Sequence, residues 1–333
     1  MVDVDPTQIA RALELLRAGD VVAIPTETVY GLAADATNPD AIKRIYDLKG
    51  RPPTNPLIAH VASIEVAERF AHVDDRARKI FECFAPGPIS VVLPKRDGPK
   101  SIAPEATAGL PSVAIRIPKH PIALELLKKF DGPLAAPSAN KSNHVSPTTA
   151  QHVRDEFGDR VFIIDGGPCS IGIESTVLDL TTSRARILRP GHVMRELIES
   201  TIGDVDTVDP STDESIDQDQ PALSPGMQKK HYAPTTPAYR FDRSQSEDAL
   251  KKSERQSRAV IVFGNETIET NFDLTEDPTH AAHHFYDTLR RIDGEHFEVI
   301  LIEIPPEGSE WLGLHDRIRR ATQPIDALKS PAR

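Results

Sequence analysis

VVAIPTETVYGL, residues 21–32, joins a short apolar run to a dense group of polar side chains. The run VVAIPT has the length and composition of a buried strand, and apolar residues at helical spacing from Thr7 to Ala18 precede it. Similar apolar runs recur, separated by helix-like segments, at PLIAHV (56–61), ISVVLP (89–94), VAIRIP (113–118), PLAAPS (133–138), VFIIDG (161–166) and STVLDL (175–180). This alternation predicts a mixed α/β domain with a twisted sheet.

The composition changes after Gly203. Residues 204–224 offer acids, Ser, Thr and Pro, with no Lys or Arg and little to bury, which is typical of a linker. From about Pro237 a second pattern of strands and amphipathic helices appears, at AVIVFG (259–264), AAHHFYDTLRRID (281–293), VILIEI (299–304) and DRIRRAT (316–322). We therefore predict a first domain over 1–203, a linker over 204–236, and a small α/β domain with a parallel sheet over 237–333.

Composition narrows the possible functions. The net charge of −11 argues against a general nucleic-acid binder, because phosphate-backbone affinity needs clustered Lys and Arg. No apolar run approaches the length of a bilayer span, and the N-terminus lacks a signal-peptide pattern, so we expect a cytoplasmic protein without a membrane partner. Cys83 and Cys169 form no CxxC pair, so we expect two buried thiols and neither a disulfide nor a zinc site.

Two cations flank a glycine at the end of a predicted helix, in the segment KGRPP that begins at Lys49. One interpretation is a solvated helix C-terminus, where Lys49 and Arg51 offset the helix dipole. The other is a polyphosphate clamp, in which Lys supplies a compact charge, Arg a planar fork, and the prolines a stiff backbone. The prolines favour the clamp.

Polar groups also lie in or after other predicted strands. Arg116 and Ser112 share one face of a strand, and an arginine within an apolar strand is costly unless an anion pairs with it. Ser138 and Asn140 follow a strand end, where ligands bind in α/β sheets, although each also suits an ordinary loop. Likewise, the polar group at 25–31 suits either a binding site or a capping turn. The chain has neither GxxxxGK[ST] nor GxGxxG, and His280 and His284, at helical spacing, fit a solvated face better than a metal site.

Several motifs taken in order resemble the YrdC-like family: PTETVYGL, KGRPPTNPLIAHV, PGPISVVLP, LPSVAIRIPKHP, PLAAPSANKSNHVSPT, GIESTVLDL and ILRPGHV. SPGMQKKHYAPTTP (224–237) and the tail resemble the two-domain form of that family, the threonylcarbamoyl-AMP synthases. The resemblance implies a concave, positively lined groove and a small Rossmann-like second domain.

The resemblance also implies site residues, with Lys49 and Arg51 as the catalytic cations. For ATP it points to Lys49, Arg51, Asn55, Ser112, Asn140, Ser146 and Arg189, with His231 and Tyr232 of a lid segment HYAP (231–234) closing over the nucleotide. For threonine it points to Thr28, His60, Arg116, Ser138, Ser175 and Thr176. Ser90 stands where the family more often has threonine, which keeps the hydroxyl.

The implied reaction joins bicarbonate to L-threonine and transfers the AMP of ATP to the carbamate, with Mg²⁺ on the phosphates and no protein-bound metal. The product would pass to a threonylcarbamoyl transferase acting on tRNA. One rival is carbamoyl transfer in metal-cofactor maturation, but the zinc-finger cysteines of those chains are missing here. The other is an RNA-binding or ribosome-associated module that uses the same basic groove, and the acidic total charge opposes it.

Overall fold

A computed structural model describes residues 5–208, 231–264, 268 and 272–328. The strands of the first domain are β1 (Val22–Ile24), β2 (Gly31–Asp35), β3 (Ile58–His60), β4 (Ile89–Pro94), β5 (Ser112–Arg116), β6 (Leu134–Ala135), β7 (Phe162–Ile163), β8 (Thr176–Asp179), β9 (Ala185–Arg189) and β10 (Val205–Thr207). Its helices are α1 (Pro6–Arg17), α2 (Pro39–Lys49), α3 (Ile64–Ala67), α4 (Asp75–Phe84), α5 (Pro121–Phe130), α6 (Ala150–Phe157) and α7 (Arg195–Ile202). The predicted mixed α/β domain is confirmed.

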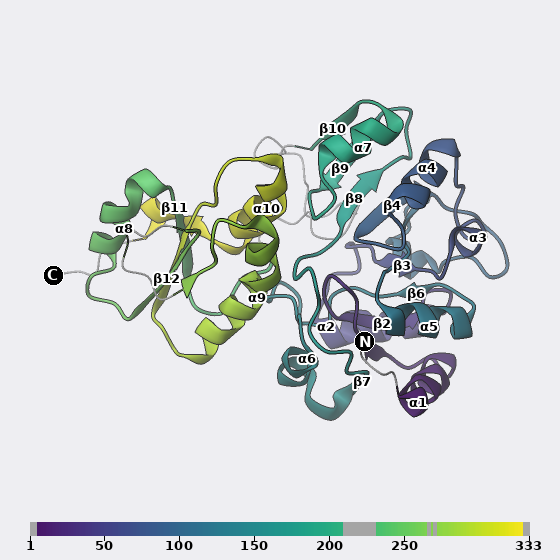
Figure 1. The fold of residues 1–333 in the computed structure, drawn as a ribbon. Helices are drawn as coiled ribbons and strands as arrows, with labels where there is room; N and C mark the ends of the chain where they lie inside the picture. The colour runs from purple at the N-terminus through teal and green to yellow at the C-terminus, as the bar shows by residue number, and fades with distance from the viewer. Residues whose placement is uncertain (1–4, 209–230, 265–267, 269–271, 329–333) are drawn as a thin grey trace.

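The second domain has strands β11 (Ala238–Phe241), β12 (Arg258–Val262), β13 (Phe272–Asp273), β14 (Val299–Glu303) and β15 (Gln323–Pro324), with helices α8 (Ser246–Lys252), α9 (Pro278–Gly294) and α10 (Leu312–Ala321). Its sheet runs β13-β12-β14-β11-β15, and every pair in it is parallel, as predicted. Helices α9 and α10 lie on the side of this sheet that faces the first domain (Figure 1).

The sheet of the first domain has ten strands in the order β10-β9-β8-β4-β5-β3-β6-β2-β1-β7 and mixes parallel with antiparallel pairs. It extends through β10, so residues 205–207 belong to this sheet although the predicted linker began at 204. Of the linker motif, residues 224–230 lie outside the described residues, whereas HYAP lies within them.

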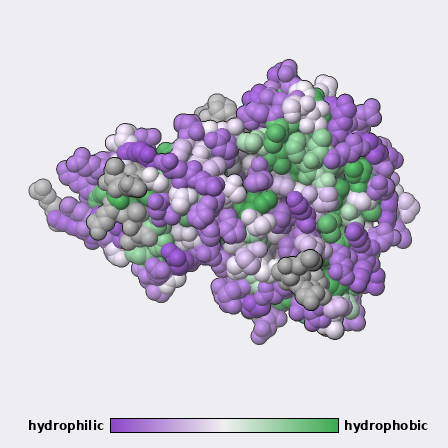
Figure 2. Space-filling model, in the orientation of Figure 1, coloured by the Kyte–Doolittle hydropathy of each residue, from purple (hydrophilic) through white to green (hydrophobic). Residues whose placement is uncertain are grey.

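Apolar side chains cross from one domain to the other. The core cluster that packs Phe285 of α9 and Leu314 of α10 also contains Val29, Val145 and Ile173 of the first domain. Burial of such a shared cluster stabilises one relative placement of the two sheets. On the face of the molecule that Figure 2 shows, polar side chains cover much of both domains, and apolar side chains gather on the first domain near β4 and β8.

The two cysteines differ in exposure. Cys169 is buried, as expected, but Cys83 is exposed, so that expectation is wrong for Cys83. The reason is helical phase: in α4 the neighbouring Ile80 and Phe81 take the buried face, which leaves Cys83 toward solvent. Among the described residues, no helix is both long enough and apolar enough to cross a bilayer.

Candidate functional site

Lys49 is the last residue of α2, yet it is only 3% exposed. Its Nζ donates to the carbonyl oxygens of Ser138 at 2.5 Å and Asn140 at 2.6 Å, and its own carbonyl accepts from the Ser142 amide at 2.8 Å. Burial, together with the nearby Arg51 charge, holds the pKa of Lys49 well below its ordinary value. The solvated-helix interpretation is therefore wrong for Lys49.

Gly50 ends α2 in a left-handed conformation, with φ of +60°, and turns the chain so that Arg51 is buried too. Arg51 donates from Nε to the Asn55 carbonyl at 3.1 Å and from one terminal nitrogen to the Pro56 carbonyl at 2.9 Å. Burial lowers the pKa of Arg51 to about 10. The partners of both cations are thus neutral carbonyls, which leave the positive charge largely uncompensated.

The HYAP segment lies against these cations. The His231 amide donates to the Arg320 carbonyl at 3.3 Å, and the Ala233 amide donates to the Asn143 carbonyl at 2.8 Å. Burial lowers the pKa of His231 well below its ordinary value, and the charges that lower it further are, from the largest effect to the smallest, those of Arg51, Lys49, Arg189 and Arg320. One imidazole therefore marks the point where four cations from three distant parts of the chain converge.

Several polar atoms at this point are buried and have no hydrogen-bond partner among the described residues. They are both side-chain amide atoms of Asn55, Oδ1 of Asn140, Nδ1 of His231 and the Tyr232 hydroxyl. Unpaired buried polar groups are costly and concentrate at functional sites. All four residues were assigned to ATP by the family resemblance, so their unpaired atoms fit a polar ligand beside the cations.

A second row of polar side chains crosses the sheet. Arg116 of β5 is in register with His60 of β3 on one side and with Ser90 of β4 on the other. The Ser90 hydroxyl is 2.8 Å from the Ser175 hydroxyl, which also accepts from Arg189 at 3.2 Å. Burial lowers the pKa of His60 to about 3, so its imidazole is neutral at physiological pH. The row links the residues assigned to threonine to the cationic group through Arg189.

Arg116 forms a buried ion pair with a carboxylate of the protein itself, that of Glu27. A terminal nitrogen of Arg116 donates to Oε1 of Glu27 at 2.8 Å, while Oε2 of Glu27 accepts from the Lys119 amide at 3.0 Å. Burial opposes the charge on Glu27, but Arg116 outweighs it and lowers the pKa of that carboxyl. Nε of Arg116 is buried and has no partner among the described residues, so one edge of the guanidinium remains for a ligand.

The remaining assigned residues differ in their surroundings. Thr28 is fully buried, with its hydroxyl 2.9 Å from that of Thr26. The Thr176 hydroxyl donates to the Val193 carbonyl and accepts from the Val193 amide, so it fastens the chain locally. Ser112 lies at the far end of β5 from Arg116, and within the described parts of the chain no side-chain hydrogen bond joins it to the other assigned residues.

Four further residues take part that the sequence alone did not single out for function: Glu27, Glu174, Tyr286 and Arg317. Glu174, between GI and ST of the GIEST motif, accepts from the Ser146 hydroxyl at 2.5 Å and from the Tyr286 hydroxyl at 2.9 Å. The signal for Glu27 was present, because a buried arginine needs an anion and Glu27 follows the first strand. Tyr286 and Arg317 carried no comparable signal.

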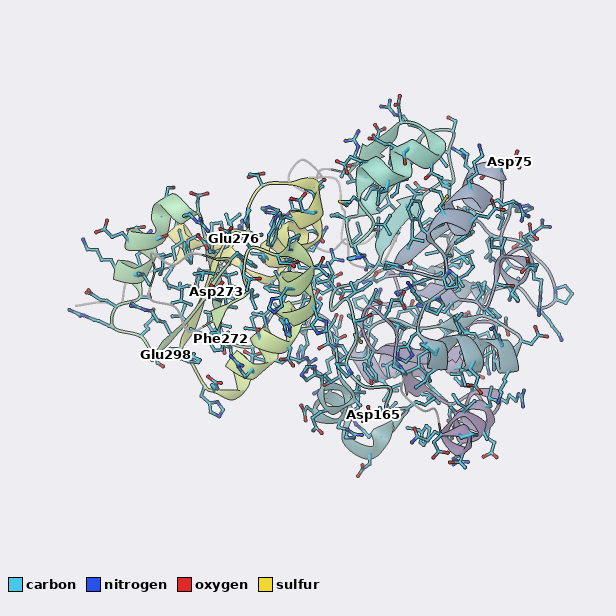
Figure 3. The ribbon with its side chains drawn as sticks, in the orientation of Figure 1. Asp75, Asp165, Phe272, Asp273, Glu276 and Glu298 are labelled. Atoms are coloured by element: carbon cyan, nitrogen blue, oxygen red, sulfur yellow. The ribbon has the colours of Figure 1, made fainter. Side chains whose placement is uncertain are left out.

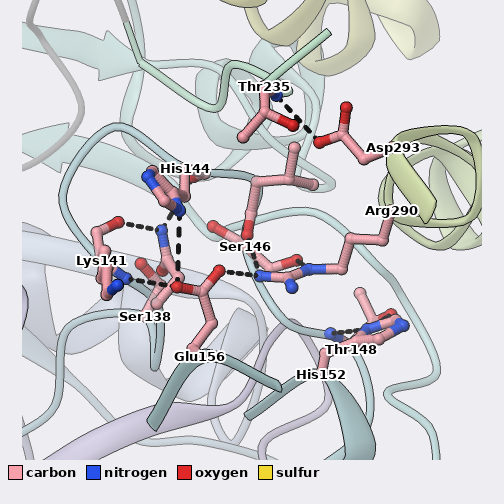
Figure 4. Close-up of polar contacts among 12 residues, drawn as sticks. Ser138, Lys141, His144, Ser146, Thr148, His152, Glu156, Thr235, Arg290 and Asp293 are labelled. Carbon is pink, nitrogen blue, oxygen red and sulfur yellow. Dashed lines mark hydrogen bonds and ion pairs between the residues drawn. The ribbon is translucent and has the colours of Figure 1, made fainter. Parts of the chain in front are cut away.

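The second domain closes one side of the site. Arg290 of α9 pairs with Glu156 of α6 at 3.0 Å, and Asp293 accepts from the Thr235 amide at 2.9 Å, as Figure 4 shows. Acidic side chains such as Asp75, Asp165 and Glu298 lie at the periphery of the molecule (Figure 3). These exposed acids contrast with the buried cations Lys49, Arg51 and Arg189 of the site.

Comparison with known proteins fits this geometry. Residues 14–191 match the Sua5/YciO/YrdC family model, described as telomere recombination, and residues 193–323 match the model described as the threonylcarbamoyl-AMP synthase C-terminal domain. The threonylcarbamoyl-AMP synthase of Bacillus subtilis is 40% identical over 95% of this chain and 93% of its own length, and that of Pyrococcus abyssi is 38% identical over 96% and 95%.

Solved structures agree. P. abyssi Sua5 complexed with L-threonine superposes with a TM-score of 0.87 at 36% identity, over 96% of this chain and 95% of that one. A P. abyssi Sua5 variant with alanines in place of a His–Tyr pair superposes with a TM-score of 0.86 at 38% identity, over 94% and 92% of the two chains. With both domains matched in sequence and in structure, this chain belongs to the two-domain threonylcarbamoyl-AMP synthase family.

Proposed function

We propose that this chain makes threonylcarbamoyl-AMP and pyrophosphate from L-threonine, bicarbonate and ATP, for the threonylcarbamoyladenosine modification of tRNA. The observation that carries the proposal is the convergence of Lys49, Arg51 and Arg189 on His231, beside the row that contains His60 and Arg116. A triphosphate and an amino acid held next to each other need this combination of charges. The likeness to a relative complexed with L-threonine supports threonine as the amino acid.

In the proposed reaction, the threonine amine displaces water from bicarbonate and forms a carbamate. A carbamate oxygen then attacks the α-phosphorus of ATP, and pyrophosphate leaves. The protein forms no covalent bond in this scheme; it positions the reactants and stabilises the developing charge. We assign Lys49 and Arg51 to the phosphates, and the free edge of Arg116 to the threonine carboxylate. His60, neutral at physiological pH, cannot add a like charge beside Arg116.

Mg²⁺ fits this site only as a companion of ATP. Among the described residues, no group of three or more His, Cys, Asp or Glu side chains could hold a metal ion. The buried carboxylates Glu27 and Glu174 near the assigned residues are already paired with Arg116 and Arg317. Buried Asp316 is likewise paired with Arg317 and Arg320. We propose that the phosphates carry the ion, which would supply charge neutralisation there, as is usual for Mg²⁺ with nucleotides.

The decisive experiment is mass spectrometry of the products after the protein is incubated with ATP, L-threonine and bicarbonate. In parallel, Arg51→Ala should lower threonine- and bicarbonate-dependent release of pyrophosphate by about 10²–10³-fold, the usual cost of removing one stabilising donor. Arg44→Ala, on the exposed face of α2, the helix that precedes Arg51, is the matched control and should stay near wild type. Undiminished turnover in Arg51→Ala would refute the role given to Arg51.

The RNA-binding alternative is not favoured. Lys49, Arg51 and Arg189 are each less than a tenth exposed, so the phosphates of a double helix cannot reach them. ATP turnover with no salt-dependent RNA binding is the expected result when both are measured. We further propose that the product passes to a separate transferase acting on tRNA.

A further inference from the structure

The inference concerns Glu174 and Arg317, which face each other across the junction of the two domains. Arg317 of α10 is fully buried, and its Nε donates to Oε2 of Glu174 at 2.9 Å. Its terminal nitrogens donate to the Pro190 carbonyl at 2.8 Å and to the Glu174 carbonyl at 3.3 Å. One guanidinium from the second domain is therefore bound to two motifs of the first, GIEST and ILRPGHV.

Each end of this pair touches a residue assigned to ATP. Oε1 of Glu174 accepts from the Ser146 hydroxyl at 2.5 Å. On the other side, the Arg317 guanidinium carbon lies 5.2 Å from the centre of the Tyr232 ring, within the range of a cation–π contact. The Tyr286 ring packs 5.9 Å from that of Tyr232, and its hydroxyl donates to Glu174 at 2.9 Å. The ion pair thus connects the lid segment to the loop that carries Ser146.

We propose that Glu174 and Arg317 form a cross-domain latch that positions Tyr232 of the lid segment and Ser146 for ATP, so that the second domain contributes positioning residues to the site. The inference rests on the proposed function, because Tyr232 and Ser146 matter here as ATP-binding residues.

Domain docking alone does not require this arrangement. Buried ion pairs contribute little net stability compared with apolar packing, and the shared apolar cluster already joins the two domains. Tyr232 also has a left-handed backbone, with φ of +60°, which is uncommon for a bulky residue and needs support from its surroundings. The rings and the guanidinium packed around Tyr232 provide that support.

The pKa shifts of Glu174 and Arg317 are consistent with a permanently charged ion pair. Burial would raise the pKa of the Glu174 carboxyl, but the charges of Arg317 and Arg189 outweigh burial and lower it. Burial would lower the pKa of Arg317, yet its surroundings, which include Tyr232, Glu174 and Asp316, raise it well above the ordinary value. Both groups are therefore charged at neutral pH, and the latch is not a switch in that range.

The test uses Glu174→Gln, Arg317→Met and the double variant in the full chain, with steady-state kinetics in ATP and in threonine. Each single variant should raise KM for ATP at least tenfold and change KM for threonine less than twofold, since the row of His60 and Arg116 is untouched. The double variant should be no worse than the worse single one. Arg317→Lys, which keeps the charge but not the fork, should fall between Arg317→Met and wild type.

Asp287→Asn is the matched control for domain docking. Asp287 of α9 lies 3.3 Å from His152 of the first domain, and this pair touches neither Tyr232 nor Ser146. Emission of Trp311, the only tryptophan, reports whether the second domain is folded. If Arg317→Met fails to fold, Tyr286→Phe removes one hydroxyl from Glu174 without loss of packing, and a smaller rise in KM for ATP, about threefold, is expected.

Hydrogen exchange at the His231 and Ala233 amides gives a readout that does not depend on turnover. Faster exchange in Glu174→Gln and Arg317→Met, but not in Asp287→Asn, supports the latch. Unchanged exchange, or a drop in kcat with both KM values intact, overturns it. If wild type makes no threonylcarbamoyl-AMP, the proposed function fails by itself, and the exchange data still decide whether the latch holds the lid segment.

Discussion

Glu27→Gln tests the site where the structure adds most to the sequence. The carboxylate is 5% exposed and accepts from both Arg116 and the Lys119 amide, and Arg116 is 4% exposed. Glutamine has nearly the same shape and keeps an acceptor for Arg116, but it removes the negative charge. The buried guanidinium then has no anion at that edge.

The size of the effect follows from this geometry. Breaking a buried ion pair costs about 3–5 kcal/mol, and the acceptor that glutamine retains returns part of it, so we expect about 3 kcal/mol of lost stability. For a domain of about 200 residues this lowers Tm by roughly 6–12 °C. Glu68→Gln is the control, because Glu68 and its partner Arg78 are both more than a third exposed, and such a pair contributes less than about 1 kcal/mol.

Thermal unfolding in the presence of threonine tests the role that we propose for Arg116. If its carboxylate binds the free edge of Arg116, saturating threonine should stabilise Glu27→Gln more than wild type, since it supplies the missing negative charge. L-threoninol, which lacks the carboxylate, should not. Thermal unfolding with each ligand measures both effects. Equal stabilisation by threonine and threoninol would show that Arg116 does not hold the carboxylate, and an unchanged Tm in Glu27→Gln without ligand would show that the ion pair is not formed.

Two other outcomes follow from buried titratable groups. His60 has a pKa of about 3 in the folded protein, lower than in the unfolded chain, so the unfolded state binds more protons at acid pH. Wild type therefore loses stability as pH falls from about 6.5 to 3, and His60→Gln should lose less over the same range. Urea titrations at several pH values measure this difference. Lys49 has a lowered pKa that a bound triphosphate should raise, so ATP binding at alkaline pH should be accompanied by proton uptake. Calorimetry in buffers of different ionisation enthalpy measures this uptake, and Lys49→Met should reduce it.

Local patterns were sufficient to predict much of the fold. Apolar runs marked β3, β4, β5, β12 and β14, because a buried strand needs little more than a short stretch of suitable side chains. β2 was missed because its sequence, GLAAD, has low strand propensity and is held by its neighbours β1 and β6. The order of the ten strands could not be predicted, since it depends on contacts between distant segments.

The site shows the same division. Lys49 could have been placed inside, because Ile42, Ile45 and Lys49 lie on one face of α2, and a lysine on an apolar face is a signal in itself. The partner of Arg116 could not be chosen, because Glu27 is 89 residues away and many carboxylates compete for the role. Arg317 and Glu174 are 143 residues apart and belong to different domains, so no local pattern connects them.

The buried cations of this junction fall into two classes that only the structure separates. Arg317 is met by carboxylates and its pKa is raised, whereas Lys49 and Arg51 are met by neutral carbonyls and their pKa values are lowered. Arg317 has its anions already, so its role is to hold the two domains together. A cation that has only carbonyls is stabilised when an external anion arrives, and that difference supports our proposal that Lys49 and Arg51 bind the phosphates.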